Sequence, residues 1–503
     1  MKRKSGILLP VFSLPGKYGI GGFTKEAYRF VDFLVKAGQS YWQILPIGPT
    51  SYGDSPYQSF STFAGNPYFI DLDDLREQGL LKPKDLRDLP KVKKEDRIDY
   101  EMLYYSRYPV LRKAYERMEK EDPAFLAFKE EQRQWLWDYA LFMAIKDANG
   151  GKSFTCWETS LRKRDAAALE AFVAEHGEDI DFYAFLQYQF YRQWYKLKAY
   201  ANEQGILIIG DIPIYVAADS ADVWSHPELF QMNEEGDLTA VAGCPPDGFS
   251  ATGQLWGNPL YNWEKHAEDG YSWWTRRMEA CSRLYDVIRI DHFRGFDQYY
   301  SIPAQDETAE NGHWEDGPGL ALFQALHHAL GELNIIAEDL GYITDSVRKL
   351  VSDTGFPNMK VLEFGFDGRD SSTADADPGE NIYLPFNYNN NCVVYTGTHD
   401  NETLLGWLSS ISPEELSGVK QYLGLPQKTG RKDLVEPLIR LAQSSVADLA
   451  MIPLQDYLKL DNSGRINQPS TLGINWMWRA DKAQLSASLA KSIRKITRTY
   501  GRI

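Results

Sequence analysis

Short apolar runs recur along the chain, and stretches of mixed polarity separate most of them. The first run covers residues 6–12 (GILLPVF) and has the length of a strand. Apolar residues from Ala27 to Val35 then recur at helical spacing, with Thr24 placed to cap this helix and Gly38 to end it. Seven more runs of strand length follow, at residues 41–47, 206–212, 287–291, 335–339, 359–364, 392–397 and 449–453.

Helical patterns fall between most pairs of runs. The clearest begins at Ser412 with a capping box to Glu415 and proline at the first helical position, and it stops at Gly424. Continuous apolar strands that alternate with helices predict a parallel sheet covered on both faces. Eight of them predict an α/β fold, a (β/α)8 TIM barrel with large insertions between strands. A doubly wound open sheet is the alternative.

Two intervals are longer than a simple connection requires. Residues 60–180 are rich in charge and predict a mainly helical insertion subdomain. Residues 213–265 are rich in glycine, proline and aromatic residues and predict a loop-rich insertion. Residues 370–380 (DSSTADADPGE) predict an exposed loop. We therefore expect residues 1–503 to form one catalytic barrel that carries these additions.

Composition and charge exclude several classes of protein. Hydrophobic residues make up 43% and charged residues 25%, as in soluble globular proteins. A net charge of −16 disfavours nucleic acid and anionic membranes as partners. No stretch approaches the roughly 20 apolar residues that span a bilayer. The N-terminus superficially resembles a signal peptide, but Pro10 and Pro15 break its apolar run, so we predict a cytoplasmic protein.

Cysteine and aromatic residues add two further constraints. The four cysteines are scattered, and without a CxxC pair they indicate neither a disulfide framework nor a thiolate zinc site. Aromatic residues make up 14% of the chain, and several tyrosines and tryptophans lie in glycine- and proline-rich loops. They either pack in the core or stack on flat ligands such as sugar rings.

Acidic residues stand at or beyond the ends of four predicted strands. They are Asp211, Asp291, Glu338 with Asp339, and the acids of residues 398–402 (THDNE). A TIM barrel places its active site at the carboxyl ends of its strands, so these acids are expected at one face. A single acid in such a position is usually a helix cap or a turn residue. Four such ends, two with a neighbouring histidine or arginine, favour a functional site.

Converging carboxylates suit two kinds of chemistry. Glycosidic bond cleavage needs a nucleophile and a proton donor, and a third acid can stabilise the cationic transition state. A divalent metal site of Asp and His is the other possibility. Barrel metallohydrolases usually have an HxH pair at the end of the first strand, where this chain has Val11-Phe12-Ser13. Because that pair is missing, the metal hypothesis is the weaker one. The sequence also shows no phosphate loop, GxSxG, HExxH or thiol nucleophile motif.

A set of short motifs spans the chain. It comprises residues 55–59 (SPYQS), 64–67 (AGNP), 210–213 (GDIP), 243–247 (GCPPD), 253–259 (GQLWGNP), 289–295 (RIDHFRG), 337–341 (AEDLG), 397–401 (GTHDN) and 465–467 (RIN). Together they resemble the motifs of glycoside hydrolase family 77, the 4-alpha-glucanotransferases called amylomaltase or disproportionating enzyme. The resemblance covers essentially the whole length, and the combined set is specific although single pieces are weak.

The resemblance implies roles for individual residues. Asp291 matches the nucleophile that forms a covalent glucosyl-enzyme intermediate, Glu338 the general acid/base, and Asp400 the transition-state stabiliser. Residues that match, or lie near, substrate-contacting positions are Tyr57, Asp211, Asp247, Phe249, Gln254, Trp256, Arg289, His292, His399 and Asn467. The family is retaining and uses neither a metal nor an organic cofactor. Its substrates are an α-1,4-glucan donor and a glucose or maltooligosaccharide acceptor.

Elementary chemistry adds three expectations. Arg289 lies two residues before Asp291 on one strand, so both side chains share a face and the guanidinium can keep the carboxylate ionised. Glu338 must be protonated to act as an acid, so we expect a raised pKa. Retaining enzymes hold the two carboxyl groups about 5–5.5 Å apart, and we predict this separation for Asp291 and Glu338.

Transfer and hydrolysis share the same covalent intermediate, and a transferase must admit a sugar hydroxyl before water. The loop from Gly243 to Pro259 is either a lid over the acceptor or a packed surface loop. The main alternative is an α-amylase-like α-glucan hydrolase. A non-catalytic glucan-binding protein and a metallohydrolase are the others. Tyr52 is a candidate for a secondary glucan site. The oligomeric state is left open.

Overall fold

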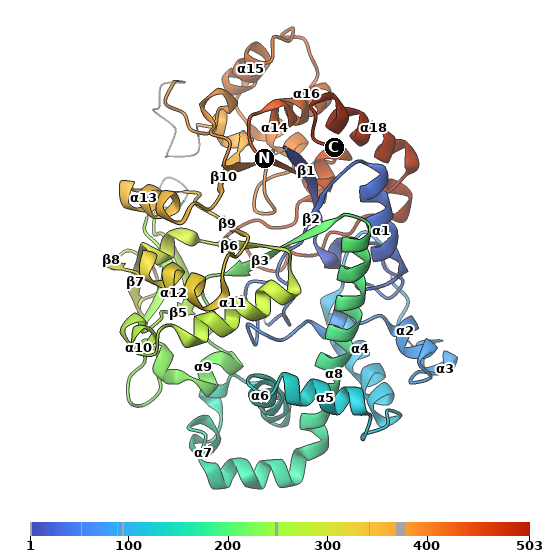
Figure 1. The fold of residues 1–503 in the computed structure, drawn as a ribbon, viewed down its shortest axis with the longest axis vertical. Coiled ribbons are helices and arrows are strands. Elements are labelled where there is room, and N and C mark those ends of the chain that lie inside the picture. The colour runs from blue at the N-terminus through green and yellow to red at the C-terminus, as the bar shows by residue number, and fades with distance from the viewer. Residues whose placement is uncertain are drawn as a thin grey trace.

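The computed structural model describes residues 3–51, 53–87, 89–92, 95–246, 250–341, 343–368 and 379–503 (Figure 1). Eight parallel strands form a closed barrel in the order β1-β12-β11-β10-β9-β6-β3-β2. Their bounds are β1 Lys4–Leu8, β2 Tyr41–Gln43, β3 Leu207–Pro213, β6 Val287–Asp291, β9 Ile335–Ala337, β10 Asn358–Val361, β11 Cys392–Tyr395 and β12 Leu449–Pro453. Each of the eight apolar runs overlaps one of these strands. The predicted TIM barrel is therefore confirmed, and the open-sheet alternative is wrong.

Several strands are shorter than their apolar runs. β1 ends at Leu8, before Pro10, which cannot donate to a strand ladder, and residues Val11–Ser13 form a 3-10 turn instead. β2 covers only the first three residues of the run 41–47, although Ile44, Leu45 and Ile47 are also buried. The segments that leave the barrel at its carboxyl end are themselves buried. Apolar character therefore marks burial here, and it overestimates strand length.

Two helices begin and end where the sequence predicts. Helix α1 (Lys25–Lys36) follows Thr24, whose side chain accepts a hydrogen bond from the Glu26 backbone amide, and Gly38 follows in the left-handed region at φ +69°. Helix α15 (Pro413–Tyr422) has both reciprocal hydrogen bonds of the Ser412–Glu415 capping box. Local capping chemistry thus sets these boundaries.

Residues 72–203 contain a group of helices, most of which lie in the lower half of the molecule in Figure 1. They are α2 Leu72–Glu77, α3 Pro83–Arg87, α4 Tyr100–Glu116, α5 Pro123–Glu131, α6 Leu136–Ala148, α7 Thr159–Arg162 and α8 Ala166–Glu203. α8 has non-helical backbone angles at His176 and returns the chain to the barrel. The Gln187 side chain on α8 accepts from the Gly65 amide at 2.7 Å and donates to its carbonyl at 3.0 Å. The assignment of residues 60–180 as a separate subdomain stays a prediction.

A second, antiparallel sheet stands beside the barrel in the order β5-β4-β7-β8. Its strands are β4 Ala240–Cys244, β5 Gln254–Pro259, β7 Gln298–Pro303 and β8 His313–Asp316. Two of them lie inside the interval 213–265, where the sequence predicts mainly loops. These two strands could not be predicted because glycine and proline interrupt the apolar alternation that marks a strand. The sheet joins this interval to the segment that follows β6.

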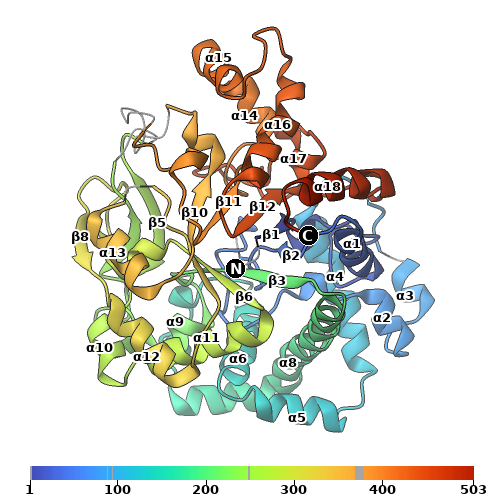
Figure 2. The same cartoon turned by 45° about the horizontal axis from the view of Figure 1, so that its top comes forward.

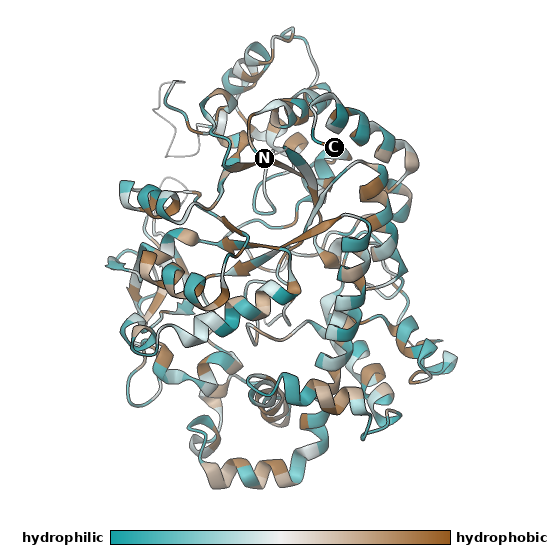
Figure 3. Cartoon of the chain, in the orientation of Figure 1, coloured by the Kyte–Doolittle hydropathy of each residue, from teal (hydrophilic) through white to brown (hydrophobic). Residues whose placement is uncertain are grey.

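Helices surround the barrel, whose strands follow one another around its axis in Figure 2. In addition to those above, they are α9 Ala221–Ser225, α10 Trp263–Glu268, α11 Ser272–Leu284, α12 Leu320–Leu330, α13 Asp345–Thr354, α14 Leu404–Ser410, α16 Arg431–Ser444, α17 Leu454–Tyr457 and α18 Ala487–Thr499. Barrel strands are mainly hydrophobic, whereas the outer helices carry much hydrophilic surface (Figure 3). In the described part of the chain, no helix combines the length and apolar character needed to cross a bilayer.

Candidate active site

The acids predicted from the strand ends lie at the carboxyl end of the barrel. Asp211 is near the end of β3, Asp291 is the last residue of β6, and Glu338 directly follows β9. These three strands are neighbours in the barrel, so their ends are adjacent. Asp400 lies on the loop that follows β11. The Asp339 carboxylate is different, because it accepts from the Met359 amide at 3.0 Å and links β9 to β10.

Arg289 connects two of these acids. Its Nη1 donates to Asp211 Oδ1 and Oδ2, both at 2.7 Å, and to Asp291 Oδ1 at 3.1 Å. Arg289 and Asp291 therefore share one face of β6, as the sequence predicts. The guanidinium does not hold the pKa of Asp291 low, however. Burial outweighs its attraction and raises the pKa of Asp291 to about 6.

Glu338 is held by backbone amides. The His292 amide donates to Oε2 at 2.6 Å, and the Leu340 amide donates to Oε1 at 2.8 Å. Burial, followed by repulsion from Asp291, outweighs these hydrogen bonds and raises the pKa of Glu338 to about 7. The raised pKa expected for a general acid is present in the structure. No side-chain motif could have indicated the two amides, because any residue except proline supplies an N–H group.

The pKa of Asp400 is lowered, whereas the pKa of Glu338 is raised. Its Oδ1 accepts from Asn467 Nδ2 at 2.7 Å, and its Oδ2 lies 3.3 Å from His399 Nε2. Burial raises the pKa of Asp400, but attraction and hydrogen bonding from His399 and Asn467 outweigh it and bring the pKa well below its usual range. Asp400 is therefore ionised under conditions in which Glu338 is still protonated.

Tyr57 connects Asp211 on β3 with His399 on the loop that follows β11. Its hydroxyl donates to Asp211 Oδ2 at 3.0 Å and lies 2.9 Å from His399 Nε2. The rings of Tyr57 and His399 stack with centroids 5.3 Å apart and planes 14° apart. Burial, assisted by Asp211, raises the pKa of Tyr57 well above its ordinary value, so the phenol keeps its proton. A continuous polar network thus runs from Asp291 through Arg289 and Asp211 to Asp400.

The second sheet supplies another wall. Trp256 on β5 and His292 form a T-shaped pair with ring centroids 4.8 Å apart, and Trp256 Nε1 donates to Gln254 Oε1 at 3.1 Å. Burial, and then repulsion from Arg294, lowers the pKa of His292 to about 3, so its imidazole is neutral. Eight of the ten predicted binding residues lie in the described part of the chain, and all eight take part in these contacts together with the three predicted catalytic residues. Three predicted residues, Asp247, Phe249 and Tyr52, lie outside the described residues, as does most of the interval 370–380.

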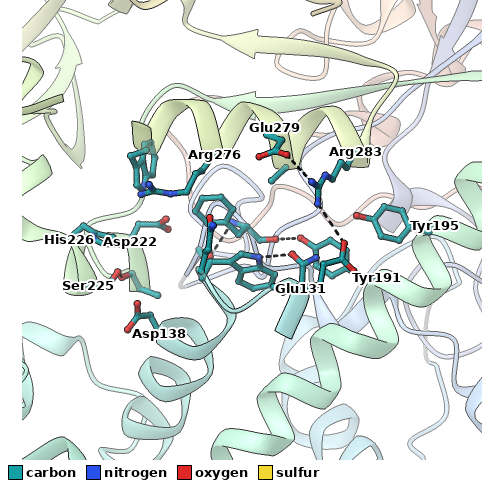
Figure 4. A pocket seen from close by; sticks show the side chains of 18 residues that line it. Glu131, Asp138, Tyr191, Tyr195, Asp222, Ser225, His226, Arg276, Glu279 and Arg283 are labelled. Carbon is teal, nitrogen blue, oxygen red and sulfur yellow. Dashed lines mark hydrogen bonds and ion pairs between the residues drawn. The ribbon is translucent and has the colours of Figure 1, made fainter. Parts of the chain in front are cut away.

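A separate cavity of about 230 Å³ lies among helices α6, α8, α9 and α11 (Figure 4). Arg283 on one wall lies 3.6 Å from Glu131 and 2.8 Å from Glu279. None of the predicted site residues in the described part of the chain lines this cavity. The candidate active site is therefore the polar network at the barrel mouth and not this space between helices.

Metal ligation was the alternative use of converging acids. Over the residues that the structure describes, no group of three or more His, Cys, Asp or Glu side chains is arranged to hold a metal ion. The acids at the barrel mouth are bonded to arginine, tyrosine, asparagine and backbone amides instead. These polar groups can bind the hydroxyl groups of a ligand. They also keep the carboxyls in different states of ionisation.

A TIM barrel that holds a carboxyl of raised pKa and an ionised carboxylate at its mouth has the arrangement of enzymes that act on glycosidic bonds. The sequence profile of the 4-alpha-glucanotransferases, Glyco_hydro_77, matches residues 9–485. A 4-alpha-glucanotransferase of Clostridium butyricum is 48% identical, over 98% of this chain and 99% of the relative. A 4-alpha-glucanotransferase of Streptococcus pneumoniae is 47% identical, over 100% of this chain and 98% of the relative. The structure of "Amylomaltase from Streptococcus agalactiae in complex with acarbose" covers 100% of both chains at 41% identity and a TM-score of 0.94. The chain belongs to the 4-alpha-glucanotransferase family, glycoside hydrolase family 77.

Proposed function

We propose that the protein transfers segments of α-1,4-glucan from a donor chain to the 4-hydroxyl of glucose or a maltooligosaccharide. The family assignment favours transfer over the α-amylase-like alternative. The observation that carries the assignment of residues is the difference in pKa between Glu338, raised to about 7, and Asp400, held well below its usual range. One barrel mouth thereby offers a proton donor and a stable anion at the same pH.

In the first step, the Glu338 carboxyl gives its proton to the glycosidic oxygen while the Asp291 carboxylate attacks the anomeric carbon. The bond to the leaving glucan breaks, and that glucan departs with the proton from Glu338. The transferred segment stays attached through an ester to Asp291. The Arg289 contact at 3.1 Å to Asp291 Oδ1 supports this role, because it orients the nucleophile and lowers its pKa against the effect of burial.

In the second step, Glu338 is a carboxylate and takes the proton from the acceptor 4-hydroxyl. The acceptor oxygen attacks the anomeric carbon, and the ester bond to Asp291 breaks. Two inversions give net retention, and both carboxyl groups return to their starting states. The separation of about 5–5.5 Å between the carboxyls of Asp291 and Glu338, which this mechanism requires, stays a prediction.

Asp400 is assigned to stabilise the cationic transition state and to accept hydroxyl hydrogen bonds from the transferred sugar. The remaining binding roles are assigned to Tyr57, Asp211, Asp247, Phe249, Gln254, Trp256, Arg289, His292, His399 and Asn467. The contact between Trp256 and His292 supports an aromatic wall on the side of the second sheet. The mechanism uses no metal or organic cofactor, and a cytoplasmic location stays a prediction from the sequence.

The test is the product ladder from maltotriose. A transferase yields glucose together with oligosaccharides longer than maltotriose, whereas a hydrolase yields glucose and maltose without elongation. Asp291→Ala is the control, and it should lose nearly all activity if the protein is the catalyst. Release of glucose and maltose alone would contradict the proposal. Elongation that persists in Asp291→Ala would contradict the assignment of the nucleophile.

A further inference from the structure

Arg465 contacts the backbone of Asp400, although the two residues are far apart in the sequence. Its Nη2 donates to the backbone carbonyl of Asp400 at 2.8 Å. Its Nε donates to the backbone carbonyl of Asn467 at 2.7 Å. One guanidinium group thus joins the loop after β11 to the segment that follows the 3-10 turn Asn462–Gly464.

Asn467 continues this connection. Its backbone amide donates to the His399 carbonyl at 3.1 Å, and its side chain donates to Asp400 Oδ1 at 2.7 Å. With the two bonds from Arg465 there are four hydrogen bonds: two hold the carbonyls of His399 and Asp400, one holds a carboxylate oxygen of Asp400, and one joins Arg465 to Asn467. We call these four bonds the Asp400 bracket.

The position of Asp400 explains why such a bracket is needed. β11 ends at Tyr395, so no strand ladder fixes residue 400. The Asp400 side chain is 41% exposed, and its own amide has only a long bond of 3.3 Å to Thr398 Oγ1. A carboxylate on such a loop can rotate away from the sugar unless its backbone is held. The planar guanidinium suits this task because it presents several N–H donors in a fixed geometry.

We propose that Arg465 is a positioning residue that acts on the reaction through Asp400. It holds the Asp400 carbonyl and the Asn467 carbonyl in register, and Asn467 in turn aims the carboxylate at the transferred sugar. The inference rests on the role given to Asp400 in the proposed function. It adds a residue that does not itself contact substrate.

Steady-state kinetics on maltotriose test the proposal with Arg465→Ala and Arg465→Lys. Small displacements of a positioned group cost about 10²-fold in rate, so Arg465→Ala should lower kcat about 10²-fold with KM changed less than about threefold. Lysine can replace one of the two bonds, so Arg465→Lys should give an intermediate kcat. Arg97→Ala is the matched control, because Arg97 Nη2 donates to the Ser463 carbonyl at 3.0 Å on the same segment without touching Asp400. It should keep kcat within about twofold.

A double-mutant cycle separates action through Asp400 from general destabilisation. In an Asp400→Ala background, assayed with the activated donor α-glucosyl fluoride, Arg465→Ala should add less than about threefold further loss. An equal loss in both backgrounds would overturn the proposal, as would an effect on KM alone or a loss matched by Arg97→Ala. If Asp400→Ala itself keeps full activity, the proposed role of Asp400 fails, and this inference fails with it for that distinct reason. Thermal melting of each variant shows whether it is folded, and Arg465→Lys serves if Arg465→Ala is not.

Discussion

The backbone amide of His292 donates a hydrogen bond to the Glu338 carboxylate, with 2.6 Å between N and Oε2. His292 directly follows Asp291, so this bond ties the proposed acid/base to the chain segment of the proposed nucleophile. The amide points at Glu338 because His292 adopts a left-handed conformation at φ +56°. The spacing of the two carboxyls is therefore set by main-chain geometry as well as by the barrel strands.

This geometry predicts different outcomes for two small substitutions of His292. Glycine adopts a positive φ without cost, whereas alanine is strained there by about 1 kcal/mol. Both remove the imidazole and its contact with Trp256. We expect His292→Gly to be more stable than His292→Ala by about 1 kcal/mol in chemical denaturation, with both having reduced transfer activity. Equal stability of the two variants would show that the left-handed backbone is not retained.

Glu338→Gln tests the acid/base role independently of binding. General acid/base catalysis contributes about 10²- to 10⁴-fold, so transfer from maltotriose should fall by about 10³-fold. α-Glucosyl fluoride carries a leaving group that needs no protonation, and its first step should be largely preserved. Intact-protein mass spectrometry should then detect a glucosyl group on the variant. Asp291→Asn is the control and should not become labelled. Equal losses on both donors would argue against Glu338 as the acid.

The pH dependence follows from two raised pKa values. Asp291 must be ionised to attack, and burial raises its pKa to about 6. Glu338 must be protonated to donate, and burial with repulsion from Asp291 raises its pKa to about 7. The value of kcat/KM should therefore rise as pH increases through about 6 and fall as pH increases beyond about 7. Because the groups interact, the two limbs belong to the pair.

The control for this profile is Glu338→Gln with α-glucosyl fluoride, measured as release of fluoride in the first step. This reaction should keep the acidic limb and lose the alkaline one. A profile that is flat from pH 5 to pH 8 in the unmodified enzyme would contradict the assignment of both carboxyls. An alkaline limb that persists in Glu338→Gln would assign that limb to another group.

Much of the barrel could be predicted because its strands are buried on both faces and separate clearly from the helices. Their ends could not, since Ile44, Leu45 and Ile47 are buried although they lie beyond β2. The strands β4 and β5 could not be predicted because glycine and proline interrupt their apolar alternation, and because β4 pairs with β7, a partner that local sequence pattern does not encode.

The site divides in a similar way. Their positions at strand ends predicted that Asp211, Asp291 and Glu338 lie at one face of the barrel. Only the family resemblance assigned them different roles. Strand-end position alone could not separate Glu338 from Asp339, and the structure shows that the Asp339 carboxylate accepts from the Met359 amide. The Asp400 bracket depends on Arg465 and on backbone carbonyls. Every residue has a backbone carbonyl, so the sequence does not show which carbonyls accept hydrogen bonds from Arg465.

The raised pKa of Glu338 also has a consequence for stability. The folded state binds this proton more tightly than the unfolded chain, whose glutamate has the ordinary value of 4.5. The stabilisation is therefore complete below about pH 4.5 and is lost as pH rises through about 7. Glutamine stays neutral, so the melting temperature of Glu338→Gln, relative to the unmodified enzyme, should be higher at pH 8 than at pH 5. A difference of about 2 kcal/mol between the two pH values is expected from the shift. Glu77→Gln removes an exposed carboxyl on α2 and should show no such change. A pH-independent difference for Glu338→Gln would mean that the buried carboxyl is ionised without cost.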